Sequence, residues 1–311
     1  MATRAEPVRR RRPSAASSWV DRHIGWVLVS PAVLIVLALT IFPLLFSLWV
    51  AFVQFDFTLG PEHPWVGLDN FRENWRDPVW RSSLWRTVWF SATVVTIELV
   101  LGLTLALAML RPFRGRRVLM TMFVVPLFIS PVVVGGFFDL FVRRPYGVMN
   151  QLASWVWPGT VTIDFSNDTP WLYIVLFTAD VWQWTPFMFI ILLAGLAAIP
   201  DTLYEAADLD GAKPRQSFFF VTLPLLLPII LIAVTFRLID AVKLFDIIFT
   251  LTRGGPGTDT YTTSYYLYQQ GFEFFHLGQA TAGAWMFLIG ISFISFWLVR
   301  RLLKPVEEDT L

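Results

Sequence analysis

Long apolar stretches constrain this chain more than any other feature of its sequence. They lie at residues 26–53, 87–110, 118–141, 171–197, 219–245 and 280–302. An α-helix rises about 1.5 Å per residue, so roughly twenty apolar residues are needed to cross a hydrocarbon core about 30 Å thick, and each stretch meets that length. The chain is also 56% hydrophobic, well above an ordinary soluble domain. Because lipid offers the backbone no hydrogen-bond partners, we expect an all-α polytopic membrane helix bundle with about six transmembrane helices.

Basic residues predict the orientation of this bundle, since short loops rich in Lys and Arg stay on the cytoplasmic side. They flank the first stretch, fill the loop after the second and follow the last: Arg9 to Arg12, Arg111, Arg114, Arg116, Arg117, Arg300, Arg301 and Lys304. With six crossings, all of them fall on one side. We therefore expect a multi-pass membrane protein with both termini in the cytoplasm. The expected organisation is a basic tail at 1–25, a transmembrane domain at 26–303 and a second tail at 304–311.

Several functional classes find no support in the composition. The chain has no Cys, and its three histidines, His23, His63 and His276, are scattered singly, so we expect no metal site. The run from Gly211 to Pro214 lacks the upstream Gly and the Ser/Thr of a phosphate-binding loop, so the chain is not expected to bind or hydrolyse ATP. A net charge of +1 does not suggest a nucleic-acid partner. We find no convergent set of residues for a membrane-embedded hydrolase or transferase.

A short polar segment within the loop at about 199–218 has the pattern of an exposed helix. Gly211 can adopt the left-handed conformation that ends a helix. Glu205, Asp208 and Leu209 have the spacing that places side chains on one helix face, giving two carboxylates beside an apolar contact. We interpret the segment as a docking element on the cytoplasmic side; a merely solvated surface helix is the alternative.

The same loop carries a family signature. Glu205-Ala206-Ala207, then Gly211, then Val221-Thr222-Leu223-Pro224 resembles the EAA motif of ABC importer permeases, with Val221 where Ile is usual. The resemblance implies a type I ABC importer permease whose coupling helix sits in a cleft of an ATPase subunit. The residues to which it assigns ATPase coupling are Glu205, Ala206, Ala207, Asp208, Asp210 and Gly211.

Other segments narrow the resemblance to carbohydrate importers. Residues 66–71 (VGLDNF), Phe245-Asp246 and residues 251–257 (LTRGGPG) are similar to membrane subunits of the maltose, trehalose and glycerol-phosphate type, and the similarity extends from about Pro31 to the end. It implies import of a di- or oligosaccharide such as trehalose or maltose. It also implies a second permease subunit, two ATPase subunits that bind ATP and Mg, and an external sugar-binding protein. The alternatives are a glycerol-phosphate importer permease and an ATP-independent secondary transporter, which would leave the EAA loop unexplained.

Polar residues within the apolar stretches mark a possible substrate pathway. A charged residue inside a membrane helix costs roughly 2.5 to 3.5 kcal/mol, so it normally faces a cavity or a partner. Sugars are bound by aromatic faces together with carboxylates and amides, and the fourth and fifth stretches offer this mixture. In maltose-type relatives, sugar contacts come from positions that match Asp180, Gln183, Trp184, Phe187, Arg237, Asp240, Ala241 and Leu244.

Three observations leave alternatives open at this stage. Arg237, Asp240 and Lys243 are three residues apart, which also suits an ion-pair ladder along one helix that never touches substrate. Trp182 and Trp184 face different sides of a helix, so at most one is expected to line the pathway. Glu98 and Asp139 are single intramembrane carboxylates, which we interpret as hydrogen-bond partners between helices; a role in transport is the alternative.

Overall fold

The computed structural model describes residues 15–58, 60, 62–143, 147–156 and 168–307, and its elements are helices joined by turns and isolated bridges. The basic run at 9–12 and the end of the predicted C-terminal tail at 308–311 lie outside the described residues. The chain divides after Val50 into two units, each considered by itself.

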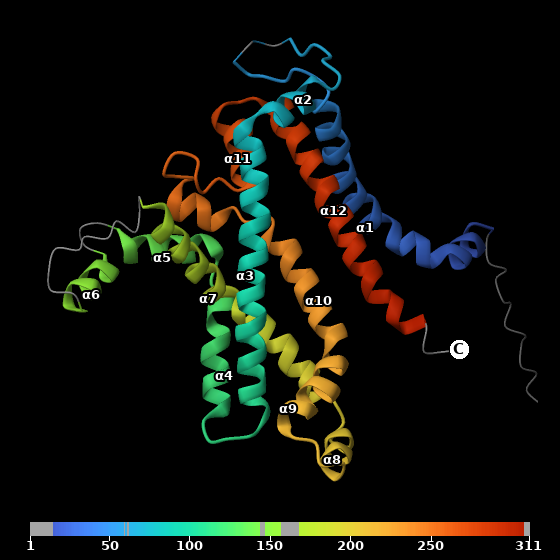
Figure 1. The fold of residues 1–311 in the computed structure, drawn as a ribbon. Helices are drawn as coiled ribbons and strands as arrows, with labels where there is room; N and C mark the ends of the chain where they lie inside the picture. Colours follow the sequence, from blue (N-terminus) through green and yellow to red (C-terminus); the bar gives the residue numbers. More distant parts are fainter. Residues whose placement is uncertain (1–14, 59, 61, 144–146, 157–167, 308–311) are drawn as a thin grey trace, which may run out of the picture. The chain divides into compact units, whose positions relative to one another are not determined.

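The elements follow one another along the chain as shown in Figure 1. They are α1 (Ala15–Val50), α2 (Asp69–Arg76), α3 (Pro78–Leu110), α4 (Arg116–Val124), the 3-10 segment η1 (Val125–Phe128), α5 (Pro131–Val142), α6 (Val148–Val156), α7 (Thr169–Ala197), α8 (Asp201–Leu209), α9 (Pro214–Ser217), the π-helical segment η2 (Phe218–Thr222), α10 (Leu223–Ala241), the π-helical η3 (Ile248–Thr252), α11 (Thr263–Tyr268), the π-helical η4 (Gln269–Glu273) and α12 (Leu277–Glu307).

The predicted all-α membrane architecture is confirmed. The first unit holds one apolar helix long enough to cross a membrane, His23–Val50. The second unit holds four more, at Pro78–Leu110, Thr169–Ala197, Pro214–Ala241 and Leu277–Trp297. A bent pair of shorter helices brings the number of candidate spans in the described residues to six.

The expected continuous helix at 118–141 is wrong, because the chain breaks between η1 and α5. The two halves, Arg116–Phe128 and Pro131–Val142, meet at 98°. Ile129 and Ser130 are extended, with ψ of 133° and 136°, because a residue before proline is pushed out of the helical region and Pro131 has no N–H to continue the ladder. Gln183 Nε2 donates to the Ile129 carbonyl at 2.7 Å, so the break keeps one freed backbone group satisfied within the membrane.

The fifth span also ends earlier than expected. Its α-helix stops at Ala241 rather than continuing to 245, and Val242 and Lys243 form a turn. Lys243 and Leu244 therefore lie beyond the helix.

Helices α3, α7 and α10 pack against one another to form the centre of the second unit. Asp77 starts α3 by accepting a hydrogen bond from the Val79 amide at 2.7 Å, with Pro78 in the first turn. A Cβ on Gly102 of α3 would lie 2.7 Å from the Met188 Cβ of α7, so the glycine permits the close approach typical of membrane helices. Core side chains include Phe90, Val94, Leu176, Met188, Phe189, Leu192, Leu226 and Ile230. Figure 1 shows α8, α9 and the α3–α4 turn at one end of this unit, and α2 and α11 at the other.

Candidate functional site

A buried arginine on α10 connects three helices within the membrane. Arg237, 1% exposed, donates from Nε and Nη2 to the two oxygens of Glu98 on α3, at 2.8 and 2.9 Å. Nη2 also donates to Asp180 on α7. Nη1 donates to Asp240, one turn further along α10, at 3.2 Å. Three carboxylates thus converge on one guanidinium.

This arrangement differs from an ion-pair ladder along α10 alone. Arg237 and Asp240 do pair at i, i+3, but the remaining contacts of Arg237 come from other helices. Lys243 lies after the helix and forms no ion pair among the described residues, so a continuous ladder is wrong. Glu98 is the hydrogen-bond partner between helices that its position suggested. Asp139 of α5, in contrast, pairs with Arg143, the residue that follows the same helix.

A cavity of about 140 Å³ adjoins the cluster. Its walls come from α5, α7, α10 and the turn after α10: Pro131, Asp180, Trp184, Arg237, Asp240, Ala241, Lys243, Leu244, Phe245, Asp246 and Ile247. The Arg237 guanidinium carbon lies 4.9 Å from the centre of the Trp184 ring. The side chain of Asp240 is 49% exposed, so its carboxylate is accessible while it bonds to Arg237. The cavity therefore joins an aromatic face to accessible carboxylate oxygens and an exposed lysine.

The structure brings together most of the residues predicted for the substrate pathway. Those that line the cavity are Asp180, Trp184, Arg237, Asp240, Ala241 and Leu244. Gln183 is buried away from it and bonded to the break between η1 and α5, and its Oε1 has no hydrogen-bond partner within the described part of the chain. Phe187 packs edge-on against Trp184 and joins the core. Trp182 lies on a different wall, in an apolar groove with α3 and α4, so only one of the two tryptophans reaches the cavity.

Sequence reasoning missed several residues of this site. Pro131 enters it because the helix breaks before it, and Phe245, Asp246 and Ile247 enter it because α10 ends early. The prolines at 126 and 131 were the available signal for the break. No signal in a single sequence identifies Glu98 as the partner of Arg237, which lies 139 residues away.

The predicted docking helix, α8, is present and exposed. Glu205, Asp208 and Leu209 are all exposed, and Leu209 leaves 90% of its surface accessible. Ala206 and the C-capping Asp210 are exposed as well, whereas Ala207 is half-buried.

Gly211 ends α8 in the way its sequence predicts. Its φ is +75°, in the left-handed region. Its amide donates to the Asp208 carbonyl at 3.0 Å, and the Ala212 amide donates to the Ala207 carbonyl at 2.9 Å, the paired bonds of a Schellman cap. A Cβ at Gly211 would meet nothing within 4 Å, so backbone conformation rather than crowding favours glycine here.

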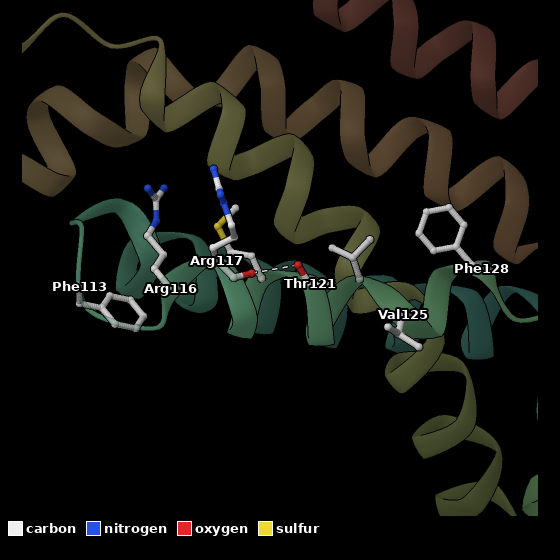
Figure 2. Close-up of a pocket in the computed structure, with 8 residues that line it drawn as sticks. Phe113, Arg116, Arg117, Thr121, Val125 and Phe128 are labelled. Atoms are coloured by element: carbon white, nitrogen blue, oxygen red, sulfur yellow. Dashed lines mark hydrogen bonds between the residues drawn. The ribbon is translucent and has the colours of Figure 1, made fainter.

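A separate groove of about 710 Å³ runs along α4 and η1. Figure 2 shows Arg116 and Arg117 pointing to the same side of α4 at one end of it, with Phe128 at the other. The Thr121 hydroxyl is satisfied internally by the Arg117 carbonyl at 3.0 Å. Apart from Arg116, Arg117 and Thr121, the side chains that line this groove are apolar.

Comparison with known proteins matches most of the chain. Residues 98–307 match the family described as binding-protein-dependent transport system inner membrane component. The chain is 35% identical over 285 residues to the trehalose/maltose transport system permease protein MalF of Thermococcus litoralis, covering 90% of each chain. It is 31% identical over 298 residues to the trehalose transport system permease protein SugA of Mycobacterium tuberculosis, covering 91% of this chain and 90% of that one.

Two further comparisons concern other substrates. The chain is 33% identical over 262 residues to the sulfoquinovosyl glycerol transport system permease protein SmoG of Agrobacterium fabrum, covering 84% of each. A solved bacterial ABC transporter that imports the acidic polysaccharide alginate has the same fold, with a TM-score of 0.80 and 22% identity over 93% of this chain and 98% of that one. The matched region of the family contains both the Arg237 cluster and α8. The chain therefore belongs to the family of binding-protein-dependent transport system inner membrane components, as an ABC transporter permease.

Proposed function

We propose that this chain is the membrane-spanning permease subunit of an ATP-driven importer that carries a di- or oligosaccharide, such as trehalose or maltose, into the cytoplasm. The observation that carries the proposal is α8: an exposed helix with two carboxylates and Leu209 on one face, closed by Gly211. A secondary transporter has no use for such a helix. An importer whose ATPase is a separate subunit requires a docking element of this kind.

The residues that line the cavity and the names of two relatives both support a sugar as the substrate. Trp184 offers a ring face beside the accessible carboxylate of Asp240, the combination that binds pyranose rings and their hydroxyl groups. Two relatives are named for trehalose, one of them also for maltose. The exposed Lys243 in the same cavity favours, as second candidate, a phosphorylated substrate such as glycerol phosphate.

The cavity also supports a two-permease assembly. Pockets for small ligands usually span about 300 to 1,000 Å³, so a cavity of about 140 Å³ is one wall of a site rather than a whole one. A second permease supplies the other wall. The groove that runs along α4 and η1 is available to this second permease or to the lipid bilayer. Two ATPase subunits hold ATP and Mg, and an external sugar-binding protein delivers the substrate.

The proposed orientation places both termini and α8 in the cytoplasm. The basic α3–α4 turn lies at the same end of the second unit as α8, which agrees with the excess of basic residues expected on that side (Figure 1). Reporter fusions after Gly115 and at the C-terminus test this orientation. An external reporter at either point would contradict it.

Variants of α8 test the coupling role. We expect Glu205→Ala to weaken association with the ATPase roughly 30-fold or more, because truncating one partner of a buried charge contact costs about 2 to 5 kcal/mol. Gly211→Val should misdirect α8, since a β-branched residue resists φ near +75°. Gly211→Asn is the matched control, because asparagine tolerates this conformation.

The measurements are co-purification of the ATPase and sugar-stimulated ATP hydrolysis in assembled complexes. All variants should be present in the membrane at normal levels, because α8 is exposed and lies outside the candidate spans. Normal association and normal hydrolysis in both Glu205→Ala and Gly211→Val would refute the coupling assignment.

A further inference from the structure

The half-buried face of helix α8 contacts the end of η2, the π-helical segment that leads directly into α10. Among its nine residues only Tyr204 and Ala207 are half-buried, and they lie three apart on one face. The Tyr204 hydroxyl lies 3.0 Å from the hydroxyl of Thr222, which is 4% exposed. Within the described residues, it is the only side-chain hydrogen bond between α8 and another helical element.

Thr222 occupies an unusual turn. It ends η2, where the Leu223 amide bonds to the Phe218 carbonyl five residues back rather than four. Pro224 follows and has no N–H to return to the Phe220 carbonyl, which favours the wider turn. The Thr222 hydroxyl donates to the Ser217 carbonyl at 3.4 Å. Because a hydroxyl has one hydrogen, its lone pairs remain free to accept the hydrogen of Tyr204.

The base of α10 is connected to the Arg237 cluster by helix alone. Thr222 and Arg237 are separated by fifteen residues of sequence, or about 22 Å at 1.5 Å per residue. Arg237 is in turn fixed to α3 and α7 through Glu98 and Asp180. A displacement of α8 that moves Thr222 thus reaches the cavity through a continuous set of packed and hydrogen-bonded groups.

We propose that the Tyr204–Thr222 hydrogen bond is the link by which α8 passes its movement to α10 and so to the cavity beside Arg237. The proposal rests on the proposed function, in which α8 docks on an ATPase. Tyr204 and Thr222 are then positioning residues: they touch neither sugar nor nucleotide. Glu205, Asp208 and Leu209, whose side chains are exposed, make the docking contact.

Cysteine labelling separates docking from transmission without needing to know the sugar. The chain has no native cysteine, so one introduced thiol is unique in it. Leu209→Cys reports docking of α8, and Lys243→Cys reports the cavity, which Lys243 lines in an exposed position. Each is placed in the full importer complex, and its rate of modification by a maleimide is measured with and without ATP.

The tested variants are Tyr204→Phe and Thr222→Val, each of which removes one hydroxyl. We expect both to retain the ATP response at Leu209→Cys and to reduce the ATP response at Lys243→Cys by about two- to tenfold, the range for losing one neutral hydrogen bond. The double variant should be no worse than either single one, because both remove the same bond. Thr222→Ser keeps the hydroxyl and should restore the response, and Thr202→Val, an exposed hydroxyl on α8, should have no effect.

The outcomes distinguish the two levels of inference. If ATP does not change the labelling rate of Leu209→Cys in a complex that carries no other substitution, the proposed function fails. If that response is normal and Lys243→Cys also responds normally in Tyr204→Phe and Thr222→Val, the link is wrong. Additive losses in the double variant, or failure of Thr222→Ser to restore the response, also overturn it, since either result would show that the two hydroxyls act separately.

Discussion

Removal of Arg237 should destabilise the bundle far more than removal of an exposed arginine. Arg237→Gln leaves Glu98 and Asp180 buried at 0% and 1% exposure without their cation. Breaking a buried ion pair by removing one partner costs about 3 to 5 kcal/mol, which corresponds to at least roughly 100-fold in the unfolding equilibrium. Arg72→Gln is the matched control: its pair with Asp69 is also close, at 3.0 Å, but the side chains are 65% and 61% exposed, so we expect about 0 to 1 kcal/mol.

A second variant tests the physical cause. Adding Glu98→Gln to Arg237→Gln removes one of the carboxylates left uncompensated, so the double variant should recover part of the lost stability. Equilibrium unfolding in mixed detergent micelles measures the free energy of unfolding of each variant. A loss in Arg237→Gln no greater than in Arg72→Gln, or a further loss on adding Glu98→Gln, would refute the reasoning that the cluster is held by compensation of buried charge.

Two further predictions concern packing and the cavity. Gly102→Ala should destabilise the bundle by about 1 to 3 kcal/mol, because its Cβ would lie 2.7 Å from that of Met188. Gly136→Ala, whose Cβ would meet nothing within 4 Å, should be neutral or stabilising. Thermal unfolding in detergent measures both variants, and equal effects would contradict the close contact at Gly102. Trp184→Ala should lower trehalose or maltose uptake by the assembled importer and leave assembly intact, while Trp182→Ala, in the separate apolar groove, should transport normally; the reverse order would place the sugar on the other side of α7.

The membrane architecture was predictable because apolar length is a local property of sequence. The ends of the helices were not. Helix α3 begins at Pro78, whereas the apolar stretch seen in the sequence begins at Thr87. Polar residues in the first turns of the helix are covered by other elements: Ser83 is fully buried, and Thr87 bonds to Thr263 at 3.0 Å. Hydropathy assigns such residues to a loop, since it does not register that another element covers them.

The candidate site was predictable only where its residues share an element. Spacing correctly placed Arg237 one turn from Asp240, and the positive φ of Gly211 followed from its place after a helix. The partnership of Arg237 with Glu98 depends on how α3 and α10 pack, which spacing along one helix does not contain. Gln183 was assigned to the pathway from its helix, but tertiary packing directs its amide to the Ile129 carbonyl.

The exposure of α8 has a consequence for how ATPase partners are chosen. Seven of its nine residues are exposed, and Gly211, which ends the helix, has open space around it. Substitutions on this face meet no core and disturb no span, so the docking surface is free to diverge between importers while the bundle stays the same. Exchange of residues 201–209 as a block, with Tyr204 kept, should therefore transfer the preference for one ATPase to another permease.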